Sequence, residues 1–136
     1  MTEKTTKKTT KKLTLTDLIK DKEKIRPQEN VTKELLVDRL GSTITIRRAE
    51  RSLVMDTIEL STDASFKGNP DEYFIYNIIT EPNLRDADLQ KAYGCAEPTD
   101  IVSKILEIGE ITSIAQEGMT LAGYNAKVTP VDDLKN

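Results

Sequence analysis

The sequence predicts a small α+β domain that is mostly α: one N-terminal β-hairpin followed by a compact bundle of about five short helices, with mobile termini. Three observations predict this class. Residues 43–47 alternate polar and apolar side chains, which is the period of a half-buried strand. Most later segments space apolar residues three and four apart, which is the period of a helix. The length of 136 residues fits one domain.

The composition divides the chain into four regions. Residues 1–12 are almost wholly Thr and Lys, so we expect a disordered leader that is either solvated or attracts an acidic partner. Residues 13–32 contain a tethered amphipathic helix and a linker with Pro27. We expect residues 33–123 to form the globular domain and residues 124–136 to form a flexible C-terminal tail.

The N-terminal helix is predicted over Thr14–Lys24. Thr14 and Asp17 have the spacing of a capping box, and Leu15, Leu18 and Ile19 lie on one face. Such a short helix is marginal alone and needs a surface to lie on. That surface belongs either to the same chain or to a neighbouring subunit, and the second alternative predicts a weak homo-oligomer.

The hairpin is predicted from Lys33–Leu40 and Thr43–Arg48, which flank the two-residue connection Gly41-Ser42. Gly41 is expected to adopt a positive φ. Because no other segment is a convincing strand, this hairpin must pack on helices or pair with another chain.

The helices follow from their caps and breakers. Asn69 is a cap with Pro70 at the first helical position, and Gly94 and Gly123 are typical helix terminators. Gly109 is expected to break the helix that Pro98 opens. The predicted helices are Ala49–Leu60, Pro70–Thr80, Asp86–Tyr93, a segment from Pro98 to Gly109, and Glu110–Ala122.

Two helices carry more apolar surface than so small a chain can cover. The helix ending at Thr80 is apolar nearly all round, so it is either central to the core or partly covered by a partner. Its β-branched residues keep a strand interpretation open. Gly118 interrupts the apolar stripe of the last helix, which indicates a close helix approach or a kink. The candidate partner-binding residues are Tyr73, Phe74, Tyr76, Ile79, Ile111, Ile114 and Met119.

The composition argues against an enzyme. The chain has no His, which removes the commonest general base and metal ligand, and it has no Trp. Cys95 lacks a partner base, so we expect a small apolar residue rather than a nucleophile. The pair Asp86 and Asp88 is explained by helix capping, and Asp132 lies in the tail. We therefore expect no catalytic site, no metal and no cofactor. No apolar run is long enough to span a membrane, and the chain is of cytoplasmic type.

A basic spot supports an alternative function. Arg47, Arg48 and Arg51 could contact phosphate, although a solvated turn balanced by Glu50 explains them as well. With the Lys-rich leader they would make a small nucleic-acid-binding regulator. Nucleic acid is nevertheless an unexpected partner, because the chain beyond residue 12 has a net charge of −7.

Several short motifs, in order, resemble the XkdN-like phage tail assembly chaperones. They are "LTLTDLIKDKEK", "GSTITIRR", Glu81-Pro82-Asn83-Leu84, and Tyr93-Gly94-Cys95 followed by "EPTDIV". The resemblance implies a chaperone from contractile-tailed phages or prophages of Gram-positive bacteria, acting in the host cytoplasm. Such a protein is expected to bind the tape measure protein, keep it soluble during assembly and be absent from the mature virion.

The resemblance also implies a second, frameshifted form. Codons for Lys135 and Asn136 after a leucine codon ending in A would give the slippery run A AAA AAN. A backward slip there would append an extension, which is expected to contact the tail tube protein.

Overall fold

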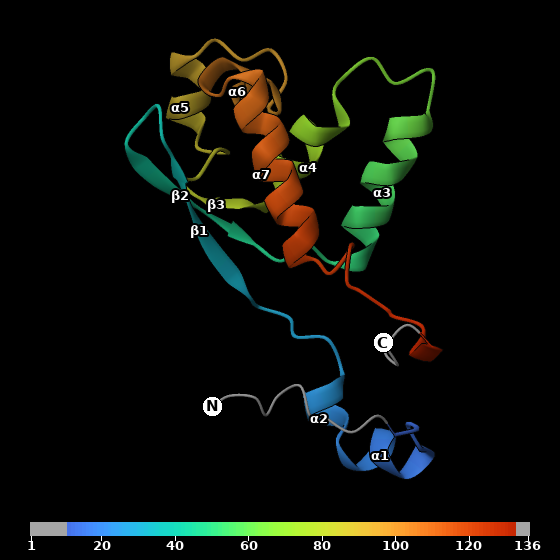
Figure 1. Cartoon of the computed structure of the whole chain (residues 1–136). Coiled ribbons are helices and arrows are strands. Elements are labelled where there is room, and N and C mark those ends of the chain that lie inside the picture. Colours follow the sequence, from blue (N-terminus) through green and yellow to red (C-terminus); the bar gives the residue numbers. More distant parts are fainter. Residues whose placement is uncertain (1–10, 133–136) are drawn as a thin grey trace.

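The computed structural model describes residues 11–132 and confirms the predicted class (Figure 1). Its helices cover 48% of the described residues, and three strands form one antiparallel sheet. The elements are α1 (Leu15–Lys20), α2 (Lys22–Ile25), β1 (Thr32–Val37), β2 (Ser42–Arg47), α3 (Arg51–Thr62), α4 (Pro70–Ile78), β3 (Ile79–Glu81), α5 (Ala87–Ala92), α6 (Asp100–Ile105) and α7 (Ile108–Leu121).

The hairpin of β1 and β2 is present, but its connection is longer than predicted. The strands pair from Thr32 with Arg47 to Val37 with Ser42, so four residues, 38–41, form the turn. The backbone N–H groups of Leu40 and Gly41 both donate to the Val37 carbonyl, which closes this turn. Gly41 has the expected positive φ, 64°.

The third strand, β3, is a feature that the sequence prediction missed. The helix expected to reach Thr80 ends at Ile78, and the chain continues directly as β3. Ile79 pairs with Ile46 and Glu81 pairs with Thr45 on β2. Because β2 then has a partner on both sides, its buried Ile46 is held in the centre of the sheet. The strand interpretation thus applies to Ile79 and Thr80, the last two residues of the predicted helix.

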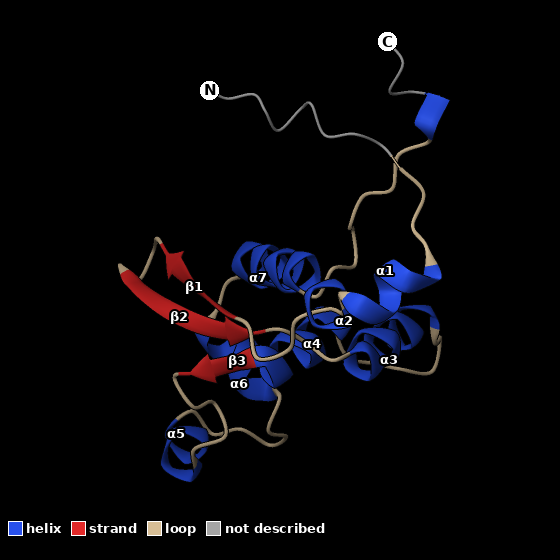
Figure 2. Cartoon of the chain, turned by 90° about the horizontal axis from the view of Figure 1, so that it is seen from below, coloured by secondary structure: helices blue, strands red, loops and turns tan. Residues whose placement is uncertain are grey.

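Helix α4 is the centre of the core. It packs on α3, α6, α7 and the sheet, and it buries Phe74, Ile75, Tyr76 and Ile78. In Figure 2, α3 lies on the side of α4 away from the sheet. The helix begins as predicted, with the Asn69 side chain accepting a hydrogen bond from the Asp71 N–H at 2.8 Å. The sequence left open whether this apolar helix is central to the core or partly covered by a partner, and the structure places it in the centre of the core.

The boundary between α6 and α7 differs from the prediction. Gly109 does not break a helix but lies inside α7, and the break is at Leu106 and Glu107. A capping box that sequence reasoning missed explains this position, because the Glu107 N–H donates to the Glu110 carboxylate at 2.8 Å.

The other predicted caps and terminators are present. Asp86 caps α5 by accepting from the Leu89 N–H, and Gly94 and Gly123 have positive φ angles of 63° and 84°. Thr14 and Asp17 form the predicted capping box. The helix that follows them is interrupted at Asp21, which separates α1 from α2.

Candidate partner-binding surfaces

Most of the predicted partner residues on the apolar segment are inside the protein. Phe74 is fully buried, and Tyr76 and Ile79 are nearly so. Tyr73 is half-buried at the edge of the core. Because a partner cannot reach Phe74 without opening the core, Tyr73 is the member of this group with surface to offer.

Helix α7 shows the same division. Ile111 and Ile114 are buried against the core, whereas Met119 is half-buried. Gly118, between them on the buried face, lies against Phe74 and Ile78 of α4. This contact decides between the two alternatives for Gly118 in favour of a close helix approach.

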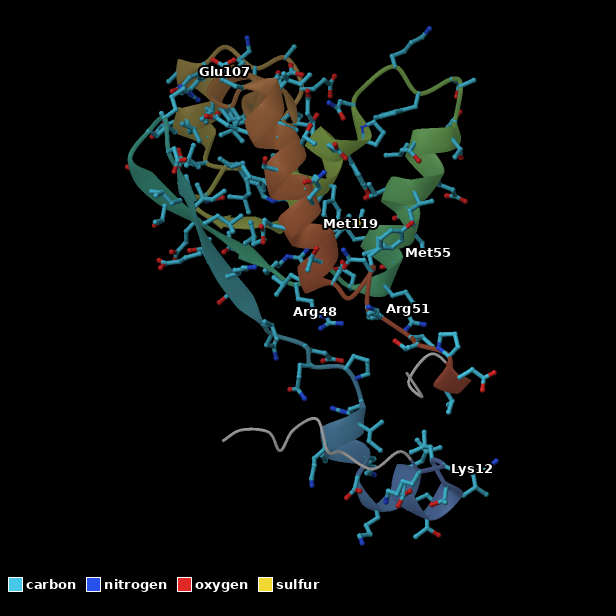
Figure 3. All side chains as sticks on the ribbon, viewed as in Figure 1. Lys12, Arg48, Arg51, Met55, Glu107 and Met119 are labelled. Atoms are coloured by element: carbon cyan, nitrogen blue, oxygen red, sulfur yellow. The ribbon has the colours of Figure 1, made fainter. Side chains whose placement is uncertain are left out.

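Met119, which is labelled in Figure 3, lines a hollow on the surface of α7. The hollow has a volume of about 590 Å³ and extends to Tyr124, which is exposed. Asp71, at the start of α4, lies at its margin, where burial raises the pKa of the Asp71 carboxyl. The hollow is lined by Asp71, Thr112, Ala115, Gln116, Glu117, Met119, Thr120, Tyr124 and Asn125.

A second concave surface runs between β1 and the N-terminal half of α7. It has a volume of about 480 Å³ and combines apolar side chains with four carboxylates. Sequence reasoning missed it because its two walls are about 70 residues apart in the chain. The signal that could have found it is the series of acidic residues at the N-cap of α7, Glu107, and within the helix, Glu110 and Glu117. Its lining residues are Leu35, Leu36, Val37, Asp38, Glu107, Gly109, Glu110, Ser113, Ile114 and Glu117.

Contacts within the chain occupy two of the three arginines of the basic spot. Arg47 forms a salt bridge with Glu50 at 2.8 Å, and Arg48 donates a hydrogen bond to the Ala122 carbonyl at 3.1 Å. Arg51, at the start of α3, is exposed. The hydrogen bonds of Arg47 and Arg48 tie β2 to α3 and to the end of α7, so the structure gives both residues a structural role.

The predicted self-association residues are exposed apolar side chains of the N-terminal segment. Leu15 is 78% and Ile19 is 73% exposed, and Leu18 is exposed as well. Neither α1 nor α2 has a buried residue. Within residues 11–132, nothing covers the apolar face of this segment.

The other residues considered for chemistry are Cys95 and the acidic side chains. Cys95 is a free thiol, half-buried against the core. Within residues 11–132, no cluster of three or more His, Cys, Asp or Glu side chains could hold a metal ion. No helix of that part of the chain is long and apolar enough to cross a membrane.

A family match covers nearly the whole sequence. The chain matches the phage XkdN-like tail assembly chaperones over residues 1–135. The chain belongs to this family. No curated protein and no solved structure matches it significantly. Membership makes the protein a chaperone of phage tail assembly, and its partner-binding surfaces are therefore expected to meet other proteins of the tail.

Proposed function

We propose that this XkdN-like chaperone binds the tape measure protein and keeps it soluble in the host cytoplasm until the tail tube has formed around it. The observation that carries the proposal is the family match over residues 1–135. A tape measure protein exposes long apolar helical stripes before assembly, and such stripes aggregate unless another surface covers them. The chaperone would have no catalytic role and would be absent from the finished particle.

The hollow around Met119 is the proposed contact for the tape measure protein. Met119 and Tyr124 offer apolar surface there, and a thioether adapts its shape to different helical partners. Tyr73, half-buried on helix α4, does not line this hollow and is proposed as a separate contact. The candidates Phe74, Tyr76, Ile79, Ile111 and Ile114 are buried, so we do not propose them as direct contacts.

Co-expression tests the proposal. The tape measure protein encoded with this chaperone is produced alone, with the wild-type chaperone, or with Met119→Asp. We expect it to be soluble only with the wild-type chain, because the carboxylate would have to be buried in an apolar contact.

Ile108→Asp is the matched control. It also replaces an apolar residue of α7 with Asp, but Ile108 is 75% exposed and does not line the hollow. This variant should solubilise as the wild type does, with circular dichroism showing that both variants are folded. If Met119→Asp is folded and still solubilises the partner, the proposed contact is wrong. If the wild-type chain fails as well, the proposed function is wrong.

We also propose a frameshifted, extended form that contacts the tail tube protein. Lys135 and Asn136 lie outside the described residues, so the proposal rests on the codon argument and on the family. An extended form that binds both the tape measure protein and the tube protein would raise the local concentration of tube protein near the tape measure. Mass spectrometry of the product from the native operon, from a phage or a prophage, tests this. A nucleotide sequence without the slippery run would exclude a slip at this site.

A further inference from the structure

We infer that a pocket lined by arginines at the end of α7 binds an acidic segment of the chaperone's protein partner, beside the apolar contact proposed at Met119. This arginine pocket has a volume of about 850 Å³ and is larger than the two concave surfaces described above. Its walls come from the linker after α2, the junction of β2 and α3, and the residues that follow α7. The charged residues of its lining are Arg26, Glu29, Arg47, Arg48, Glu50 and Arg51.

The arginine pocket has a charge opposite to that of the chain around it. Its lining contains four arginines and two glutamates, a net charge of +2. Residues 27–136 contain 11 Lys or Arg and 19 Asp or Glu, a net charge of −8. A carboxylate-bearing partner is therefore attracted to this pocket and repelled by most of the remaining surface.

Two of the arginines have hydrogen-bond donors free for a partner. Arg51, the first residue of α3, is exposed and forms no salt bridge within residues 11–132. Arg48 donates from Nη2 to the Ala122 carbonyl at 3.1 Å, which holds its guanidinium in place. Because a guanidinium has five N–H donors, Arg48 retains others that can meet a carboxylate.

The other two arginines are partly neutralised by the chain itself. Arg47 lies 2.8 Å from Glu50, and Arg26 lies 3.6 Å from Glu23 in an exposed and therefore weak pair. One further carboxylate, Glu29, lines the arginine pocket. With those pairs set aside, Arg48 and Arg51 face this single glutamate, so an excess of positive charge remains for the partner.

The arginine pocket is continuous with the hollow around Met119. Tyr124, which is 62% exposed, lines both surfaces. Figure 3 shows Arg48 and Arg51 at the end of α7 nearest Met119. A partner helix whose apolar stripe lies in the hollow would cross Tyr124 and bring the residues beside that stripe to the arginines. The inference thus rests on the proposed function for the identity of the partner, and it adds that acidic residues flank the bound stripe.

A nucleic acid fits this arrangement less well than an acidic protein segment. A phosphate backbone carries charge along its whole length and needs cations along an extended surface. The cations here are confined to the arginine pocket, and the adjoining hollow is lined by Asp71 and Glu117 without any Lys or Arg. A helix that turns apolar residues to the hollow and carboxylates to the pocket avoids those acidic side chains.

Two matched peptides test the inference with the full chain. Both are labelled amphipathic helices with the same leucine stripe, and one carries Glu beside the stripe where the other carries Gln. Fluorescence anisotropy measures their affinities. We expect the Glu peptide to bind roughly fivefold more tightly at low salt, the upper range for an ion pair at an exposed site. The difference should shrink as salt is added.

Arg51→Glu should abolish this preference, because it replaces the free cation of the arginine pocket with an anion. Lys67→Glu is the matched control, since it makes the same change in net charge at an exposed residue after α3, outside the pocket. The control should bind both peptides as the wild type does. A third peptide, with Lys beside the stripe, should bind Arg51→Glu more tightly than it binds the wild type.

Arg51→Gln removes the charge without adding one and should lose most of the preference as well. Circular dichroism checks that each variant is folded. If the wild type binds the Glu and Gln peptides equally or binds neither, or if both changes at Arg51 leave the preference intact, the inference is overturned. Duplex DNA that displaces the Glu peptide at a lower concentration than unlabelled Glu peptide, in a manner dependent on Arg51, would also overturn it. Failure of the proposed function is a separate result, in which the wild type does not solubilise the tape measure protein whatever its peptide preference.

Discussion

Gly118 on α7 lies directly against Phe74 on α4. A Cβ atom placed at Gly118 would be 2.8 Å from Cε2 of Phe74, closer than real side chains approach. The contact lies in the interface between α4 and α7. These two helices pack against each other more extensively than any other pair of helices in residues 11–132. The glycine is therefore needed for the packing of the core, although it weakens the helix in which it lies.

Gly118→Ala should lower the free energy of unfolding. The Cβ would overpack the contacts with Phe74 and Ile78, at a cost of up to about 3 kcal/mol, which outweighs the helix-propensity gain of about 1 kcal/mol. Gly109→Ala is the matched control, because it lies in the same helix and a Cβ there meets nothing within 4 Å. That change should be neutral or stabilise by up to about 1 kcal/mol. Urea denaturation measures both, and greater stability of Gly118→Ala would contradict the close approach.

Phe74→Ala should be far more damaging than Tyr73→Ala. Phe74 is fully buried, so its removal leaves a cavity that costs about 3–5 kcal/mol, a large part of the stability of a small domain. Tyr73, half-buried, should cost clearly less. Thermal denaturation by circular dichroism compares the two. Equal losses would show that the division between core and surface on α4 is wrong.

Arg39→Met should change how stability depends on pH. Arg39 donates two hydrogen bonds of 2.9 Å to Glu110, and these hold the pKa of the Glu110 carboxyl below its ordinary value of 4.5. A carboxyl with a lowered pKa in the folded state contributes stability that is complete above pH 4.5 and lost as the pH falls through the folded value.

The melting temperature of the wild type should therefore fall more steeply on acidification below pH 4.5 than that of Arg39→Met. A pH-independent difference should remain, because Arg39 also donates to the Ile105 carbonyl at 2.8 Å. Parallel melting curves from pH 7 to pH 3 would show that the Glu110 contact contributes nothing.

Nucleic acid should not bind strongly. Intramolecular contacts occupy Arg47 and Arg48, and residues 27–136 have a net charge of −8. Fluorescence anisotropy with labelled duplex DNA should show weak binding, without the steep loss of affinity between 50 and 200 mM salt, roughly 10³–10⁵-fold, that several phosphate contacts produce. If DNA affinity instead depends steeply on salt, and Arg51→Ala reduces that dependence, the result would support the alternative function as a nucleic-acid-binding regulator.

The sequence predicted the local structure where one residue type decides it. Thr14, Asn69 and Asp86 cap helices as expected, and Gly41, Gly94 and Gly123 adopt positive φ angles. These features depend on neighbours within a few residues, so they are visible in the sequence. The alternation of Ile44 and Ile46 predicted β2 for the same reason.

The missed features depend on distant residues. Ile79–Glu81 continue a helix-like apolar pattern and become a strand because β2, over 30 residues earlier, offers a free edge. Likewise, the apolar pattern of α4 could not show that α3 and α7 would cover it. The predicted partner residues were chosen for being apolar, and tertiary packing then buried most of them. The groove between β1 and α7 was missed because its walls come together only in the fold.

Size-exclusion chromatography with light scattering, on purified chaperone and its tape measure protein, tests the central claim most directly. The tape measure protein is refolded by dilution with or without excess chaperone. We predict that it aggregates alone and that with the chaperone it elutes as a soluble complex containing both chains. A tape measure protein that aggregates equally in both samples, or that is soluble alone and elutes apart from the chaperone, would contradict the proposed function.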